Sequence, residues 1–362
     1  MIPGLSLRSN PGLKLANAFG VFQTDAPSRH YRFAMQEQLT YRLFDDADLP
    51  GLLRLWEEAG WGTLTPEQWR EWFVDGPQGP SLVTVGIDER GQVAAQEVFA
   101  PSRAVVGGRE VRALRFSAPI VREELRGSSL RDGTHPVYGL FKAAEAAATE
   151  RGFSVVYSLP EHGWLPIFRI APRYGILPFA EAAYSSAALP LEAAHAPEIE
   201  RATRGFVARD VTEFGEEYEQ LWRQAKESFP IDCGVIRDKA WLSFRNSGRI
   251  AVEVRESSSD KLVGYSATKK QTGLVADLLA RESGELKNVI AATLRWLKDE
   301  QATLPDGLTH LKLMRTPTLA PVIDALGFTP IDYRFGFTCK AFDPALTLKD
   351  VAPERWYILP GD

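Results

Sequence analysis

The chain has 362 residues, a length that favours two domains over one. Hydrophobic residues make up 44% and charged residues 25%, as in ordinary globular proteins. The net charge of −5 gives no electrostatic case for a nucleic-acid partner, and no apolar run approaches the roughly 18–20 residues of a membrane span. The two cysteines, Cys233 and Cys339, form no disulfide framework and fit a reducing compartment, so the sequence predicts a cytoplasmic protein.

The first half of the chain begins with residues 1–38, which are mixed in composition and predict an irregular N-terminal arm, not a signal peptide. A short alternating strand follows from Leu39, and then a helix with leucines and Trp56 on one face. Two alternating strands around a turn at 88–91 predict a hairpin. An apolar stripe over 137–148 predicts a further helix, which leads into a buried strand.

The second half repeats this order from Phe206. A strand, an acidic turn and a helix are followed by a hairpin over 250–270, an apolar helical stripe over 286–297 and a buried strand from His310. A self-similarity at roughly 150–170 residues predicts two copies of one domain. In each copy the last short helix ends at a glycine, Gly175 or Gly327, which fits a left-handed cap.

These repeats divide the chain into five predicted segments. They are an N-terminal arm (1–38), a first domain (39–190), a linker (191–205), a second domain (206–345) and a C-terminal tail (346–362). The first copy carries about twenty extra residues between its hairpin and its central helix, so a function that needs an extended loop is expected there.

The order of strands and helices predicts an α/β fold with helices covering a mixed sheet. The segment VVYSLPEHGWLPIFRIAPRYGILP and its counterpart LPDGLTHLKLMRTPTLAPVIDALGFTPID resemble the strand five and helix four region of the GNAT superfamily of acyltransferases. The two copies resemble its tandem-domain members over residues 39–345. This resemblance implies two tandem GNAT-like domains, each a mixed, mostly antiparallel sheet flanked by helices.

The segment LRDGTHPVYG, at 130–139, aligns with the loop that holds the cofactor pyrophosphate in that superfamily, an Arg/Gln-x-x-Gly-x-Gly/Ala motif. Backbone amides and the helix dipole attract an anion at such a place. Arg131 stands at the arginine position, whereas Thr134 and Pro136 stand where glycines are expected. Thr134 can cap the helix, in competition with a ligand for the same amides, and Pro136 fits its first turn.

An alternative register starts the loop at Arg126 and Gly127. The candidate cofactor-binding residues are therefore Arg126, Gly127, Arg131, Gly133, Thr134 and His135. Other arginines between 103 and 126 could assist a phosphate-bearing donor or lie on a solvated strand. The second copy lacks both the loop and these arginines, so no cofactor is expected there.

The resemblance implies direct attack of an amine on a thioester, which needs a base and often an acid. Glu97 lies on an apolar strand, where burial would raise its pKa, unless it forms a strand-edge salt bridge. Glu161 and His162 follow the fifth strand and are the preferred pair, although they could lie in an ordinary turn. Tyr157 could donate to the oxyanion or thiolate, or be a core tyrosine.

Two further residues are candidates for substrate binding. Ala171 replaces a tyrosine that many members of the superfamily carry, and Tyr174 is the nearest remaining phenol. Asp277 is a lone acid among apolar residues of the second copy. It could bind an acceptor amine at the interdomain cleft or make a buried structural hydrogen bond.

No His/Cys cluster has metal-ligand spacing, and no Walker or G-x-S-x-G motif occurs, so no metal is predicted. The predicted function is transfer of an acyl group from acetyl-CoA or another acyl-CoA to an amine of a small molecule or peptide, within a ternary complex. Two alternatives remain open: a transferase that uses aminoacyl-tRNA or acyl-carrier protein, and a catalytically silent binding module. The acceptor, the acyl chain and the oligomeric state are not set by the sequence.

Overall fold

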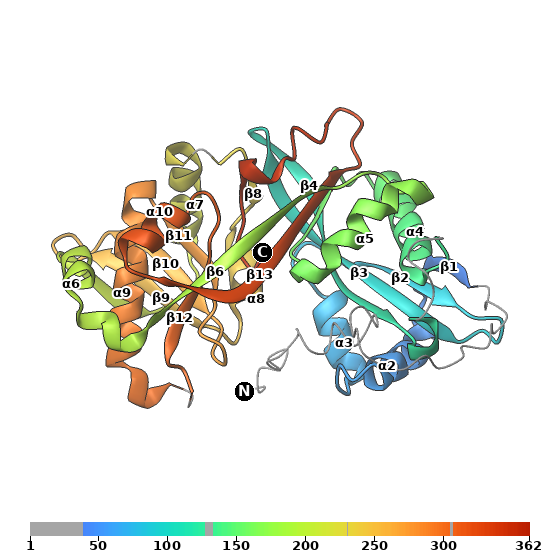
Figure 1. Cartoon of the computed structure of the whole chain (residues 1–362), viewed down its shortest axis with the longest axis horizontal. Coiled ribbons are helices and arrows are strands. Elements are labelled where there is room, and N and C mark those ends of the chain that lie inside the picture. The colour runs from blue at the N-terminus through green and yellow to red at the C-terminus, as the bar shows by residue number, and fades with distance from the viewer. Residues whose placement is uncertain (1–38, 127–132, 230, 305–306) are drawn as a thin grey trace.

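The computed structural model describes residues 39–126, 133–229, 231–304 and 307–362. The predicted N-terminal arm lies outside these residues. The described chain forms two lobes, and two long strands, β6 and β13, run between them across the middle of the molecule (Figure 1).

The described part of the first half contains six strands and four α-helices. The strands are β1 (Thr40–Leu43), β2 (Leu82–Ile87), β3 (Val93–Val106), β4 (Arg109–Val121), β5 (Val155–Ser158) and β6 (Ala180–Pro190). The helices are α2 (Leu49–Glu58), α3 (Pro66–Phe73), α4 (Pro136–Glu150) and α5 (Leu165–Ile170). This order contains the elements that the sequence predicts, with α3 as an additional helix before the hairpin.

The second half repeats the arrangement with additional short elements. Its strands are β7 (Phe206–Asp210), β8 (Cys233–Val235), β9 (Ile250–Glu256), β10 (Leu262–Thr268), β11 (Val275–Ala280), β12 (His310–Met314), β13 (Thr329–Ala341) and β14 (Trp356–Tyr357). Its helices are α6 (Pro197–Thr203), α7 (Glu216–Ser228), α8 (Lys239–Asn246), α9 (Leu286–Asp299) and α10 (Ala320–Ala325). Gly175 and Gly327 have φ angles of 77° and 78°, so both adopt the predicted left-handed conformation.

The described strands form two sheets. One follows the order β1-β2-β3-β4-β5-β13-β6-β12, with β8 beside the end of β3 and β14 beside β8, and the other has the order β11-β10-β9-β7. Among the described strands, all paired neighbours are antiparallel except β4 with β5 and β8 with β14. The fold is therefore mixed α/β with mostly antiparallel sheets, as predicted.

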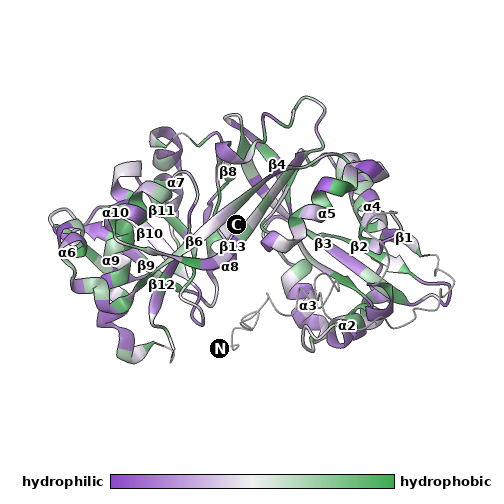
Figure 2. Ribbon diagram, viewed as in Figure 1, coloured by the Kyte–Doolittle hydropathy of each residue, from purple (hydrophilic) through white to green (hydrophobic). Residues whose placement is uncertain are grey.

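Helices cover both faces of the first sheet. Successive side chains along a strand point to opposite faces, so one strand can pack against both helix layers. Leu82 of β2 packs under α4, whereas its neighbour Val83 packs against α2 and α3. Hydrophobic residues gather on the helix sides that face the sheets, and hydrophilic residues lie on the outer sides (Figure 2). α9 covers the second sheet in the same way.

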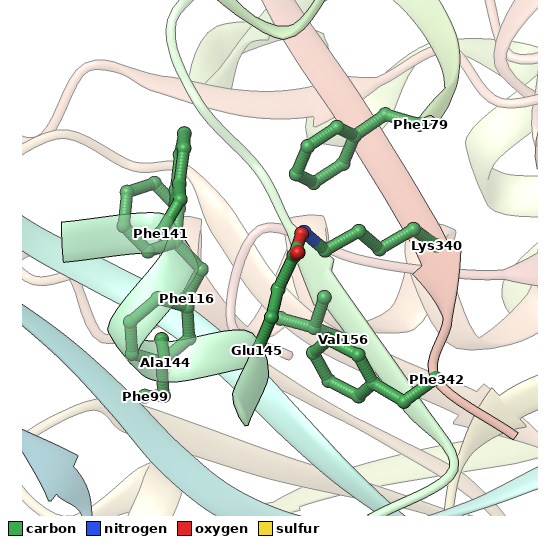
Figure 3. Close-up of a pocket in the computed structure, with 9 residues that line it drawn as sticks. All are labelled: Phe99, Phe116, Phe141, Ala144, Glu145, Val156, Phe179, Lys340 and Phe342. Carbon is green, nitrogen blue, oxygen red and sulfur yellow. The ribbon is translucent and has the colours of Figure 1, made fainter. Parts of the chain in front are cut away.

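The two halves exchange strands at the middle of the large sheet. β13 comes from the second half but lies between β5 and β6, and β6 comes from the first half but pairs with β12. Lys340 of β13 is thereby buried beneath α4, where it forms an ion pair with Glu145 (Figure 3). A register slip of one residue would turn Lys340 to the opposite face, so this ion pair fits only the observed register.

The extra residues of the first copy form the long β3–β4 hairpin. Its tip turns at Gly107 and Gly108, whose φ angles of 57° and 76° suit a tight hairpin turn. Beyond the sheet of its own lobe, the hairpin pairs with β8 of the second half, and Arg103 forms an ion pair with Asp238 at 2.8 Å. The hairpin thus joins the two halves.

Two segments outside the predicted domains pack into the second lobe. The predicted linker, 191–205, contains the 3-10 helix η5 (Leu191–His195) and α6, both of which contact α9. The predicted tail, 346–362, contains β14, and its residues Trp356 to Asp362 are buried. The end of the described chain lies between the lobes (Figure 1).

Candidate active site

The strand β4 continues beyond its neighbour β5. The two strands pair over three positions, Ala113–Arg115 with Val155–Tyr157. The remaining residues of β4, 116–121, have β3 on one side and, among the described residues, no paired strand on the other. This leaves a strand edge with which an extended, amide-bearing ligand could pair.

A β-bulge interrupts β4 along the same stretch. The register shifts so that Ala118 and Pro119 lie opposite the single residue Glu97 of β3. Ala118 has a φ of 50°, which is unusual for a residue with a side chain. Its carbonyl accepts a hydrogen bond from Gln96 Nε2 at 3.2 Å. Backbone strain of this kind gathers at functional sites.

The helix after β4 begins at Pro136, as predicted, but its cap differs from the prediction. The capping residue is His135 and not Thr134, because His135 Nδ1 accepts a hydrogen bond from Val137 N at 3.3 Å. The amide of Tyr138 donates to the His135 carbonyl at 3.1 Å. Since proline has no N–H, the first three residues of α4 have no free amide for an anion.

The turn before α4 packs against a tyrosine. Gly133 has a φ of 77°, and a Cβ built on it would lie 2.3 Å from Tyr174 Cδ1. The Tyr174 ring in turn contacts Tyr138, with ring centroids 4.8 Å apart. The side chain of Arg126 is directed back to β4, where its Nε donates to the Val121 carbonyl at 2.8 Å. The predicted residues Gly127 and Arg131 lie outside the described residues.

The burial of His135 leads us to predict that the stability of the protein depends on pH. It is 2% exposed, and burial lowers its pKa from 6.5 to about 4. Between those values the unfolded chain binds the proton and the folded chain does not, so stability is lost as the pH falls from about 6.5 to 4. Replacing His135 with asparagine keeps a capping oxygen and removes the titration.

We expect the wild type to lose about 2–3 kcal/mol more than His135→Asn over this pH range. Urea denaturation of both proteins at several pH values measures the difference. Equal slopes against pH would show that His135 does not remain neutral in the folded chain.

Glu97 lies under α4, on the face of the sheet away from the second lobe. It is fully buried, and neither carboxylate oxygen has a hydrogen-bond partner among the described residues. Burial raises its pKa well above the ordinary value, although the charge of Lys340 opposes this. Lys340 itself lies among the rings of Phe141, Phe179 and Phe342 (Figure 3).

Glu161 and His162 follow the carboxyl end of β5. Glu161 is paired with Phe335 of β13 through a backbone bridge, and its Oε1 is buried without a partner in the described part of the chain. Burial raises the pKa of this half-buried carboxyl group. His162 begins the 3-10 helix η3 (His162–Trp164) and is exposed. Tyr333, beside Glu161, has its pKa raised to about 12 by burial and by the Glu161 charge.

Tyr157 points to the opposite face of β5, toward the second lobe. It is 1% exposed, contacts the Trp356 ring at 5.6 Å and interacts with the charges of Arg115 and Asp362. Burial raises its pKa, so the phenol keeps its proton. The tyrosine therefore lies at the boundary between the two halves.

We call the surroundings of Asp362, where the two halves meet, the central region. Asp277 of β11 lies in this region and is fully buried. It accepts hydrogen bonds from Arg237 Nε at 2.9 Å and from the Tyr265 hydroxyl at 2.7 Å. The other end of the Arg237 guanidinium donates to both carboxylate oxygens of Asp362 at 3.0 Å. Of the two roles considered for Asp277, these contacts match the buried structural hydrogen bond.

The structure thus brings Tyr157 and Asp277 into one central region but keeps the other candidates apart. Glu97 faces α4, and Glu161 lies at the strand end. Several charged residues of the central region were not predicted as site residues: Arg237, Arg245, Arg249, Lys269 and Asp362. Two signals were present in the sequence. Arg115 is one of the arginines between 103 and 126 considered for a phosphate-bearing donor, and Asp277 is an isolated acid, which requires a partner when it is buried.

No family model and no curated protein matches the sequence. Solved structures do match. A GCN5-related N-acetyltransferase from Anabaena variabilis superimposes with a TM-score of 0.58 at 11% identity, over 84% of this chain and 73% of that one. The chain has the GNAT fold. A probable N-acyltransferase from Enterococcus faecalis has a TM-score of 0.56 at 12% identity, over 83% of this chain and 72% of that one.

N-myristoyltransferase of Saccharomyces cerevisiae, with bound myristoyl-CoA, shares the GNAT fold of this chain with a TM-score of 0.53 at 13% identity. The match covers 87% of this chain and 82% of that one. Within the described residues, no helix is both long enough and apolar enough to span a membrane, and no group of three or more acidic, histidine or cysteine side chains could hold a metal ion.

Proposed function

We propose that this GNAT-fold chain is an N-acyltransferase that moves an acyl group from acyl-CoA to the amine of an acceptor by direct attack. The observation that carries the proposal is the β4 edge beyond β5, with the strained bulge at Ala118. The next α-helix of the described chain is α4. Strain at such a place positions backbone groups for a ligand, and the fold is shared with acyl-CoA-dependent transferases.

The described residues fit the donor in part. The unpaired β4 edge suits the amide-bearing arm of CoA, because such an arm can pair like a strand. The first-turn amides of α4 do not suit its phosphates, because His135 and Pro136 leave none free. We therefore propose that the phosphates bind the predicted residues before α4, namely Arg126, Gly127, Arg131, Gly133 and Thr134, of which Gly127 and Arg131 lie outside the described residues. When bound, acyl-CoA supplies an activated thioester.

Within this proposal Glu161 is the general base. Its raised pKa, its buried Oε1 and its place at the end of β5 suit a carboxylate that takes a proton from an incoming amine. Tyr157 keeps its phenolic proton but is only 1% exposed, and Glu97 has no exposed surface, so we assign a proton transfer to neither residue.

The test of donor binding is titration of the protein with acetyl-CoA and with a longer acyl-CoA. Gly133→Ala is expected to weaken binding at least about tenfold, because the added Cβ collides with Tyr174 and displaces the turn. Gly152→Ala is the matched control. Gly152 also has a positive φ, 70°, but a Cβ there meets nothing within 4 Å, so both variants carry the backbone strain and one carries the collision.

Amine-dependent release of free CoA then tests catalysis. No binding of either acyl-CoA by the wild type would contradict the CoA proposal and leave aminoacyl-tRNA or acyl-carrier protein as the donor. Binding without acyl transfer to any amine would instead indicate a silent binding module. If Gly133→Ala and Gly152→Ala bind acyl-CoA with equal affinity, the turn before α4 is not part of the donor site.

A further inference from the structure

Four cationic side chains from both halves interact with one another where the halves meet, and we call them the cation group. Arg115 comes from β4, Arg245 from α8, Arg249 from the turn before β9 and Lys269 from the residue after β10. They are close enough to repel one another. Burial, and then the charges of Arg245 and Arg249, lower the pKa of Arg115 to about 9. Burial and the three arginines lower that of Lys269 to about 8.

No carboxylate of the described chain forms an ion pair with the cation group. Arg245 Nε donates to the Gly361 carbonyl at 3.0 Å, and Arg249 Nη1 donates to Asn246 Oδ1 at 2.9 Å. The side chains of Arg115 and Lys269 make no hydrogen bond to any described residue, and Arg115 Nε is buried. Arg245 and Arg249 thus donate to neutral oxygens, whereas Arg115 and Lys269 are unpaired among the described residues.

The nearby carboxylates are already engaged. Asp277 and Asp362 are bound by Arg237, which is itself fully buried. Among the described residues of this region, five cationic side chains therefore face two side-chain carboxylates. The members of the cation group are half-buried, and holding cations together with too little counter-charge is unfavourable, so the fold gains nothing from their repulsion. Perturbed, unpaired charges of this kind characterise binding sites.

The position of the cation group relates it to the acyl-transfer site. Arg115 pairs across β4–β5 with Tyr157 and lies three residues before the bulge at Ala118. We propose that the cation group binds a carboxylate or phosphate of the amine acceptor, which makes the substrate a small anionic amine. Guanidinium groups recognise both anions in a bidentate manner. The assignment to the acceptor rests on the proposed acyltransferase function, whereas anion binding itself does not.

The first test is anion binding by the full chain without any acyl-CoA. Inorganic phosphate is expected to bind saturably in calorimetric titration and to raise the melting temperature. Lys269→Met is expected to weaken this binding at least about tenfold, because a charge-assisted contact is lost. Lys261→Met is the matched control, since Lys261 is exposed and lies at the far end of β10. Arg115→Gln serves as a second variant if Lys269→Met does not fold.

The second test compares acceptors in matched pairs, alanine with alaninamide and phosphoethanolamine with ethanolamine. A lower KM for the anionic member of a pair, abolished by Lys269→Met, supports the proposal and identifies the anion. Acylation of neutral amines only would overturn it and leave the acyltransferase function intact. Phosphate binding without acyl-CoA binding would keep the anion site and reject that function. Substitutions that lower stability without changing phosphate affinity would show that the group only holds residues 356–362.

Discussion

Replacing Arg237 with methionine is expected to lower the free energy of unfolding by about 3–5 kcal/mol, the largest effect on stability that we predict. Arg237 has no exposed side-chain surface and binds Asp277 and Asp362 at 2.9 and 3.0 Å. Its Nη1 also donates to the Val235 carbonyl at 2.9 Å. Removing the guanidinium leaves two buried carboxylates without the cation that binds them directly.

The loss of stability in Arg237→Met should depend on pH. Burial already raises the pKa of Asp362 to about 6, and without Arg237 it rises further. An acid whose pKa is raised in the folded chain contributes stability below its unfolded value of about 4, and this contribution is lost as the pH rises through the folded value. The variant should therefore be more destabilised at pH 8 than at pH 5.

Two controls separate this effect from a general loss of charge. Arg209→Met breaks the exposed pair with Asp260 at 2.6 Å and should cost no more than about 1 kcal/mol. The triple change Arg237→Met, Asp277→Leu and Asp362→Leu should recover part of the stability, because it removes the unpaired charges. Urea denaturation measures all of these proteins. If Arg237→Met loses no more stability than the control Arg209→Met, the buried ion pairs are not required for stability.

The order of elements could be predicted because it depends on local patterns. The apolar stripe of α4 and the left-handed glycines Gly175 and Gly327 each report on residues nearby in the sequence. The exchange of β6 and β13 could not be predicted in this way. Strand partners are chosen by packing between distant segments, and Lys340, which fixes the register against Glu145, looks like an ordinary surface lysine in the sequence.

The central region shows the same limit. Asp277 could be singled out because it interrupts an apolar run, but its partner Arg237 lies 40 residues away and its other neighbour Asp362 lies at the end of the printed sequence. Lys269 follows an apolar strand, as many solvated lysines do. The capping of α4 by His135 instead of Thr134 reflects a choice between adjacent polar residues that depends on backbone angles.

Replacing Glu161 with glutamine is expected to lower kcat for acyl transfer about 10²–10⁴-fold, the range that a positioned general base contributes. Glutamine keeps the shape of the side chain but cannot accept the amine proton. The affinity for acyl-CoA should not change, because the carboxyl group lies at the end of β5 and not at the turn before α4. Steady-state rates with saturating acceptor, together with titration of the donor, measure the two effects separately.

The pH profile distinguishes a base from a residue that only shapes the site. The base must be ionised, and burial raises the pKa of Glu161 above 4.5, so the wild-type rate should rise with pH along an acidic limb above that value. In Glu161→Gln this limb should disappear. His162→Gln is the matched control, since His162 is the adjacent titratable residue and is exposed. If His162→Gln removes the limb and Glu161→Gln keeps it, the proton is taken by the imidazole, and the carboxyl group orients it.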